Sequence, residues 1–194
     1  MIKSFFISLM IFCLLPYAGR AQVVEKGFEQ DKGLQSQTFE LRKENDSLYW
    51  IATTSGDNVN DWRLPYPVYR FQTGDVNGDG SENAIVGVIK KTRFYPMGKR
   101  LFIFKQIDGH TASGKACKKV RPLWMGSKLG GILEDFRFIA PADGKSRGMI
   151  RALESTTDSL YVVSDYKWSG FGMKFDRFLI KGVDKETATK YLNQ

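Results

Sequence analysis

The chain has 194 residues, of which 42% are hydrophobic, and it contains 29 basic and 21 acidic side chains. This length suits a single domain with a proper core. The moderate positive charge could suggest a nucleic acid or an anionic glycan as partner. The basic residues are scattered, however, apart from a cluster over Lys115–Arg121 that is typical of a solvated loop edge, so specific nucleic-acid binding is not expected.

The first 21 residues have the pattern of a secretory signal peptide. Lys3 precedes the uncharged apolar run Phe5–Leu15, Pro16 ends that run, and Gly19 and Ala21 are the small residues that a signal peptidase reads. The run is too short for a spanning helix, which needs about 20 residues. We therefore predict cleavage after residue 21 and no transmembrane segment in the mature protein.

The cysteines bear on the compartment. Cys13 lies in the apolar run, so the mature chain keeps only Cys117 and cannot form an intrachain disulfide. Export without disulfides favours the periplasm or cell surface of a bacterium. Loss of residues 1–21 also leaves 27 basic against 21 acidic side chains, a net charge of +6.

Alternating apolar and polar residues between turn-rich segments predict a mainly β chain. Strands are expected at residues 37–43, 48–54, 68–71, 84–90, 101–105, 120–126, 136–138, 149–153, 160–168 and 174–181. Ser55–Pro67 and Asp108–Lys119 are interpreted as connections, and Pro122 places its strand at a sheet edge. Asp184 is expected to cap a short C-terminal helix that ends at about Leu192.

Two pairs of similar segments predict an internal repeat. Tyr69-Arg70-Phe71 precedes an apolar strand, and Phe136-Arg137-Phe138 does the same 67 residues later. Asp46-Ser47-Leu48 and Asp158-Ser159-Leu160 likewise each lead into a strand. The predicted units span about residues 69–135 and 136–182, and repeated units of three or four strands are typical of propeller blades.

We therefore expect one β domain, residues 22–194, built from two or three antiparallel, propeller-blade-like sheets. A mature chain of this length is too short for an ordinary closed propeller of four to eight four-stranded blades. Three alternatives remain open at this point: an open stack, a compact sandwich of the units, or a part that closes by oligomerising.

One loop predicts a specific chemistry. Side-chain oxygens stand at its positions 1, 3, 5 and 9, and a carbonyl oxygen at position 7; the residues are Asp75, Asn77, Asp79, Asn83 and Ser81. Gly78 and Gly80 allow the backbone to curl these oxygens inward. Many flexible oxygen ligands favour calcium over magnesium. The alternative is a plain hairpin connection, for which Asn-Gly and Asp-Gly are strong signals.

The loop resembles the Asp-x-Asp/Asn-x-Asp-Gly-x-x-Asp loops of FG-GAP and related calcium-binding repeats, which occur in β-propellers of secreted and surface proteins. The resemblance covers Tyr69–Lys105, including the apolar strand that follows the loop. The family usually has Asp where Asn83 stands, so only Asp75 and Asp79 would carry charge, and Glu82 would point elsewhere. The resemblance implies weak calcium binding, with a Kd of about 10⁻⁴–10⁻³ M, that stiffens the loop.

Two further sites are considered. Trp124, Tyr166, Trp168 and Phe171 would form an aromatic platform for a sugar, with Gly170 and Gly172 letting the ligand approach; the alternative is that these rings belong to the core. Glu134 and Asp135 are adjacent acids that a glycosidase could use, although neighbours on a strand face opposite sides.

The sequence thus predicts an exported, non-enzymatic binding protein of the cell envelope or surface with a structural calcium loop. Its expected partner is an envelope protein or a glycan, and oligomers are compatible with it. The alternative is an envelope hydrolase that acts on glycan or peptidoglycan through carboxylates. No residue is assigned a catalytic role.

Overall fold

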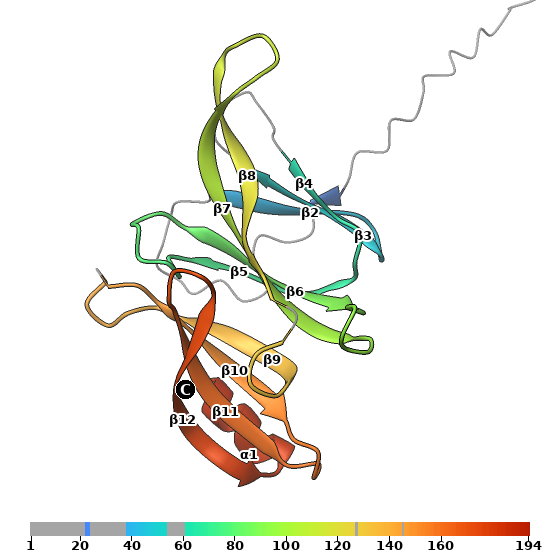
Figure 1. Ribbon diagram of the computed structural model, residues 1–194, viewed down its shortest axis with the longest axis vertical. Coiled ribbons are helices and arrows are strands. Elements are labelled where there is room, and N and C mark those ends of the chain that lie inside the picture. The colour runs from blue at the N-terminus through green and yellow to red at the C-terminus, as the bar shows by residue number, and fades with distance from the viewer. Residues whose placement is uncertain (1–21, 24–37, 54–60, 127, 145) are drawn as a thin grey trace, which may run out of the picture.

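The computed structural model describes residues 22–23, 38–53, 61–126, 128–144 and 146–194. In this part of the chain, twelve strands form three antiparallel sheets of four strands, and one short helix follows them (Figure 1). The predicted mainly β class, with antiparallel sheets and a C-terminal helix, is confirmed. The predicted signal peptide and Cys13 lie outside the described residues.

Each sheet is built from four consecutive strands, so neighbours in sequence are neighbours in the sheet. Sheet A contains β1 (Gln22–Val23), β2 (Phe39–Asn45), β3 (Leu48–Thr53) and β4 (Asp61–Leu64). Sheet B contains β5 (Val68–Gly74), β6 (Asn83–Lys90), β7 (Gly98–His110) and β8 (Ala116–Met125). Sheet C contains β9 (Ile132–Ile139), β10 (Met149–Ser155), β11 (Tyr161–Trp168) and β12 (Met173–Val183).

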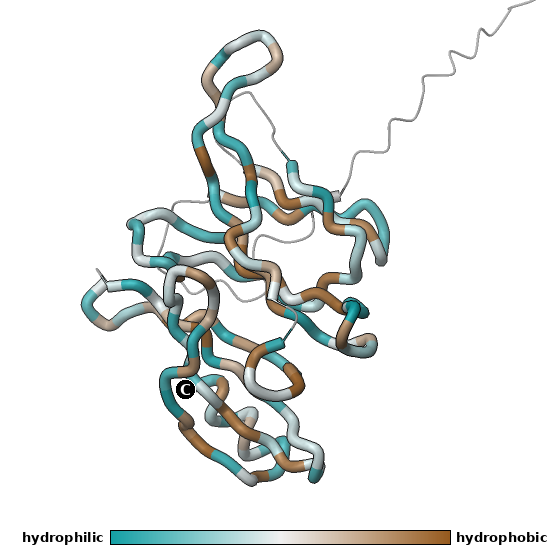
Figure 2. Tube along the Cα trace, in the orientation of Figure 1, coloured by the Kyte–Doolittle hydropathy of each residue, from teal (hydrophilic) through white to brown (hydrophobic). Residues whose placement is uncertain are grey.

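Sheet B is the middle layer of a three-layer stack (Figure 1). One of its faces packs on sheet A through Val86 and Phe104, and the opposite face packs on sheet C through Ile85 and Ile103. Because successive strand residues face opposite sides, β6 buries both of its faces, and this explains its unbroken apolar run. Figure 2 shows that the hydrophobic positions lie mainly along the strands of this stack.

The helix α1 (Lys185–Leu192) covers the outer face of sheet C, where Ala188 and Leu192 are buried against Leu153 and Val163. A helix on this face takes the place that a further sheet would need in order to stack there. The described sheets therefore form an open stack that α1 ends on one side, which is one of the three arrangements that the sequence left open.

The ends of several elements differ from the prediction. β4 lies inside the expected connection Ser55–Pro67, and the β7–β8 hairpin extends into Asp108–Lys119 because His110 pairs with Ala116. β1 was not predicted at all. Two local signals are confirmed: Pro122 lies in β8, an edge strand of sheet B, and the Asp184 carboxylate caps α1 by accepting the backbone N–H of Thr187 at 2.8 Å.

The segments that the predicted repeat relates occupy equivalent places in the sheets. The first similarity relates β5 and β6 to β9 and β10, the first two strands of sheets B and C. The second relates the turn between β2 and β3 to the turn between β10 and β11, each between the second and third strands of its sheet. The repeat itself remains a prediction.

Candidate functional site

The Asp75–Asn83 loop connects β5 to β6 at one end of sheet B. Gly78 and Gly80 have φ angles of 76° and 82°, in the left-handed region that only glycine adopts at little cost. The Asp75 carboxylate fills the turn that results, because its two oxygens accept the N–H of Gly78 at 2.6 Å and that of Gly80 at 2.9 Å. The backbone therefore curls around Asp75 as the two glycines predicted.

Asn77 provides an oxygen atom without a partner in this loop. Its Oδ1 is buried from solvent and accepts no hydrogen bond, while its Nδ2 donates to Asp79 Oδ2 at 2.8 Å. A buried acceptor left without a donor costs about 1–3 kcal/mol. A hard cation would supply the missing partner, since amide and carboxylate oxygens are the ligands that calcium takes. Asp75, Asn77 and Asp79 are thus the side chains of this loop that could hold a cation.

Asn83 has a different role from the predicted one. Its side chain is fully buried, and its Oδ1 accepts the backbone N–H of Val76 at 3.0 Å, so it ties the two ends of the loop together instead of facing an ion. Ser81 is exposed, and its carbonyl is the remaining candidate ligand. Glu82 points away from the loop, as predicted. Its Oε2 accepts the N–H of Thr38 at 3.3 Å, and Thr38 directly precedes β2 of sheet A.

The loop is fastened to sheet C. Val76 is fully buried in the core between sheets B and C, and the Asp75 carbonyl accepts the N–H of Gly148 at 2.8 Å. The ring of Phe138 packs against the backbones of Gly74 and Gly148, and a Cβ at either glycine would lie 2.2 Å from it. Order in the loop is therefore coupled to the packing of sheet B on sheet C.

The groups that this loop could offer a cation are few and weakly charged. It offers three side chains and one carbonyl, all through oxygen, and only two of these groups carry charge. In the part of the chain that the structure describes, no group of three or more His, Cys, Asp or Glu side chains comes together to hold a metal. Any ion bound here would be held by two carboxylates, an amide oxygen, a backbone carbonyl and water, an all-oxygen set that suits calcium better than zinc.

The predicted aromatic platform is not assembled on the surface. Tyr166 and Trp168 are buried in the core between sheets B and C, whereas Phe171 is 99% exposed in the turn between β11 and β12. Trp124 is half-buried and lies against Gly172, where a Cβ would come within 2.8 Å of its Nε1. This glycine gives room to a neighbouring ring and not to the predicted ligand.

Glu154 is a buried acid that the sequence did not single out. Its carboxylate accepts the Tyr166 hydroxyl at 2.7 Å and the backbone N–H of Gly131 at 2.5 Å. Burial, together with the hydrogen bond to Glu154, raises the pKa of Tyr166 well above its usual value. These contacts hold the segment between β8 and β9 on sheet C, so the role of Glu154 is structural.

Glu134 and Asp135 do not act as a pair. Asp135 binds Arg70 of β5 through two hydrogen bonds of 2.6 and 2.7 Å, and Arg137 lies 2.9 Å from it. Glu134 instead accepts the hydroxyl of Ser155 at 3.0 Å. Asp135 therefore links sheets B and C through charge-assisted hydrogen bonds to the Arg70 guanidinium.

A second pair of acids lies on the face of sheet A turned away from sheet B. Arg42 bridges Glu40 and Asp61, at 2.9 and 3.5 Å. Burial raises the pKa of Asp61 from its usual value, and the positive charge of Arg42 opposes that rise. Because the guanidinium lies between the two carboxylates, the arrangement is an ion-pair network and not an open acid–base pair.

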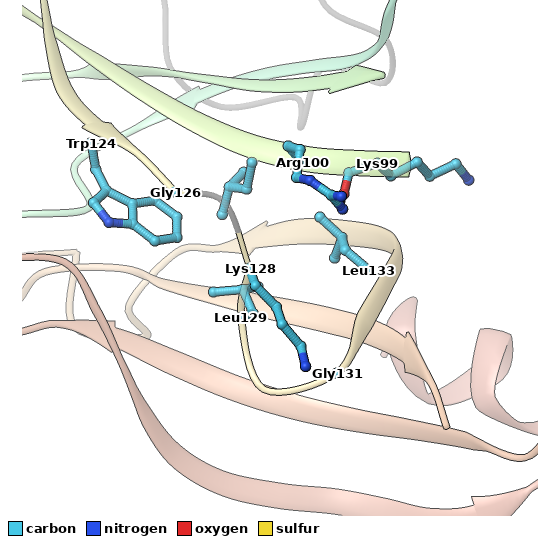
Figure 3. Close-up of a pocket in the computed structure, with 9 residues that line it drawn as sticks. Lys99, Arg100, Trp124, Gly126, Lys128, Leu129, Gly131 and Leu133 are labelled. Atoms are coloured by element: carbon cyan, nitrogen blue, oxygen red, sulfur yellow. The ribbon is translucent and has the colours of Figure 1, made fainter. Parts of the chain in front are cut away.

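The other end of sheet B carries side chains that the sequence analysis passed over. Arg100, Lys128 and Leu133 line a shallow pocket there with Trp124, and Figure 3 shows the Arg100 guanidinium turned toward it while Lys99 extends away. The loop between β6 and β7 adjoins this pocket, since the Arg100 Nη2 donates to the Pro96 carbonyl at 2.7 Å. The missed signal was five basic residues and no acid between positions 90 and 100.

Comparisons with protein-family models, curated proteins and solved structures found no match to this chain. Among the described residues, α1 is much too short to cross a membrane, and no other helix is long and apolar enough to do so. The candidate site is therefore defined by its own geometry.

Proposed function

We propose that this chain is an exported, non-enzymatic binding protein of the bacterial cell envelope, in which the β5–β6 loop binds calcium as a structural ion. The observation that carries the calcium site is the partnerless Oδ1 of Asn77, a residue that stands between Asp75 and Asp79 in the loop sequence. Calcium takes 6–8 oxygen ligands, and the loop offers four, so water would complete the shell. The resemblance to FG-GAP loops supports the same role.

The bound ion would make the contact between sheets B and C more rigid and would take no part in a reaction. Two charges among four ligands correspond to weak binding, with a Kd of about 10⁻⁴–10⁻³ M. At millimolar calcium such a site stabilises the folded protein by about 1 kcal/mol. That stabilisation would act where sheets B and C meet, because Asp75 bonds to Gly148 and Val76 lies in their shared core.

The arrangement of acids favours binding over hydrolysis. Asp135, Asp165 and Asp61 are each held by arginine, and Glu154 by a tyrosine and a backbone N–H. Glycoside cleavage instead needs two carboxyl groups about 5–10 Å apart with room for a sugar or water between them. The envelope location rests on the signal-peptide pattern of residues 1–21.

The calcium site is tested by melting the protein that begins at Gln22, with millimolar calcium and with a chelator. Calcium should raise the melting temperature by a few degrees, and both Asp75→Ala and Asn77→Ala should abolish that rise. Asn77→Ala is the cleaner variant, because Asp75 also accepts two backbone N–H groups of the loop and its loss weakens the metal-free protein.

Asp108→Ala serves as the matched control, since Asp108 is an exposed acid on the β7–β8 hairpin. It should leave the calcium-dependent rise intact. Equal melting curves of the unaltered protein with calcium and with chelator would overturn the calcium role.

A further inference from the structure

The β6–β7 loop has an unusual composition for an exposed turn. Between positions 90 and 100 stand five basic residues, a phenylalanine, a tyrosine and a methionine, and no acid. Phe94 is 76% exposed, Met97 65% and Tyr95 36%. Lys91 and Arg93 are also exposed, as is Lys128 from the segment that precedes β9. Basic and apolar side chains therefore project together from one short loop.

The loop has a defined shape that holds these side chains outward. Its backbone is bonded internally, because the Thr92 N–H donates to the Tyr95 carbonyl at 3.0 Å and the Thr92 hydroxyl oxygen accepts the N–H of Tyr95 at 3.0 Å. Arg100 fixes the other side by donating to the carbonyls of Pro96 and Lys99. Backbone groups are thus satisfied within the loop, and the exposed side chains are left to make contacts elsewhere.

The positive charge of this surface is not neutralised within the described part of the chain. None of the ion pairs there includes Lys91, Arg93, Arg100 or Lys128. Arg100 is only 7% exposed, and its hydrogen bonds go to carbonyl oxygens. A buried guanidinium without a carboxylate partner adds a fixed positive charge beneath the surface, so the loop is matched to an anionic partner.

The basic side chains also lie close to the aromatic rings. Arg93 lies 5.5 Å from the centre of the Phe94 ring, and Lys128 and Arg100 lie 5.6 and 5.9 Å from that of Tyr95. Both aromatic rings of the loop therefore have a cation beside them. The acids nearest this end of the sheet, Glu134 and Asp135, are already bonded to other groups, so they do not offset the charge.

An anionic lipid surface would bind both the basic and the apolar side chains of this loop. Aromatic side chains favour the interface between headgroups and acyl chains, and basic residues near an anionic leaflet each contribute about 1 kcal/mol. A soluble polyanion such as an acidic glycan would neutralise the cations and leave Phe94 and Met97 in water. A lipid surface has an apolar layer beneath its negative charges, so it would bury the exposed rings and the methionine as well.

We propose that the β6–β7 loop, Lys91–Arg100 with Lys128, docks the protein onto an anionic phospholipid surface, with Phe94 and Met97 inserted between the headgroups. This deepens the proposed binding function by naming the partner, and it rests on that function for access to an envelope membrane. The loop lies at the end of sheet B opposite the β5–β6 loop (Figure 1), so docking would not compete with calcium.

The test is sedimentation of the protein beginning at Gln22 with vesicles, in chelator so that calcium plays no part. Vesicles of phosphatidylglycerol and phosphatidylcholine should bind the protein at low salt, and vesicles of phosphatidylcholine alone should not. Lys91→Glu with Arg93→Glu should lower the partition coefficient by about tenfold or more. Phe94→Ser with Met97→Ser should lower it by about tenfold, because the inserted apolar area is lost.

Two control variants match these changes elsewhere. Phe171→Ser removes a 99% exposed ring from the β11–β12 turn, and Lys115→Glu reverses an exposed charge at the tip of the β7–β8 hairpin. Both should bind vesicles as the unaltered protein does. All the substituted residues are exposed, so an unchanged melting temperature confirms that each variant is folded.

Two results would overturn the lipid proposal. One is no binding to the phosphatidylglycerol vesicles; the other is binding that charge reversal abolishes but Phe94→Ser with Met97→Ser leaves unchanged, which would indicate an acidic glycan or protein instead. Because the assay contains chelator, neither result bears on the calcium site, and loss of the calcium-dependent melting shift does not bear on vesicle binding.

Discussion

The two loops that flank β6 use their polar residues in opposite ways. In the β5–β6 loop, Asp75 and Asn83 turn inward and accept backbone N–H groups, and Val76 anchors the loop in the core between two sheets. In the β6–β7 loop the backbone bonds to itself, and charged and aromatic side chains turn outward. Substitutions in the first loop should therefore change stability, and substitutions in the second should change binding alone.

The largest effect is expected from Gly74→Ala, at the start of the β5–β6 loop. The added Cβ would lie 2.2 Å from the Phe138 ring, so the ring or the backbone has to move. We expect the free energy of unfolding to fall by about 2–3 kcal/mol, as in overpacked cores. Chemical denaturation measures this.

Combining this change with Phe138→Leu should recover part of that loss, because the smaller side chain makes room for the Cβ. A double-mutant cycle without coupling between the two positions would show that Phe138 does not pack against Gly74 in this way.

Asn83→Ala should come next, with a loss of about 1–3 kcal/mol, because the buried N–H of Val76 would lose its acceptor. Asn77→Ala is the informative comparison within the same loop. Removal of the Asn77 side chain relieves the cost of its unpaired Oδ1 and loses the Nδ2 bond to Asp79, so without calcium the free energy of unfolding should not fall. Equal losses in the two variants would contradict the separate roles given to the two asparagines.

Calcium should have a smaller, local effect on hydrogen exchange near the β5–β6 loop. The Gly148 N–H bonds to the Asp75 carbonyl, so an ion in the loop should protect this amide. A stabilisation of about 1 kcal/mol corresponds to hydrogen exchange about fivefold slower. The amides of Arg93, Phe94, Tyr95 and Met97 should exchange at the same rate with calcium and with chelator, and slowing at both loops alike would indicate a general effect of the ion.

The smallest effect is expected at the other loop. Phe94→Ser with Met97→Ser removes two largely exposed side chains that belong to none of the core clusters. The free energy of unfolding should change by less than about 0.5 kcal/mol, even though vesicle binding falls. A loss above 1 kcal/mol would mean that these residues contribute to packing, and it would contradict the assignment of stability to the first loop and of binding to the second.

Short-range patterns were sufficient for much of the fold. The turns at Asp46 and Asp158, the cap at Asp184 and the left-handed glycines of the β5–β6 loop act over a few residues, where the chain itself supplies both partners. The β7–β8 hairpin was predicted too short, because its outer strand residues are polar and carry no hydrophobic alternation. β4 was missed because its 4 residues are too few to show a clear period.

The site was only partly predictable. Asn83 and Asn77 stand at odd positions of one loop, and no local pattern distinguishes the one that is buried from the one whose oxygen is left free. The same holds for the aromatic residues: Trp168 and Tyr166 proved to be core, while Phe94 and Tyr95, in a segment without any recognised motif, proved to be exposed.

By itself, then, the sequence determined the mainly β class, the helix cap, the edge position of Pro122 and the curl of the Asp75 loop. Only the tertiary structure decided that sheet B lies between two others, that α1 ends the stack, and that Asp75 meets Gly148. Alternation along a strand shows that one face is buried, yet it does not show what that face meets. Contacts between sheets join residues far apart in the chain, such as Arg70 and Asp135, and they follow from how whole faces pack.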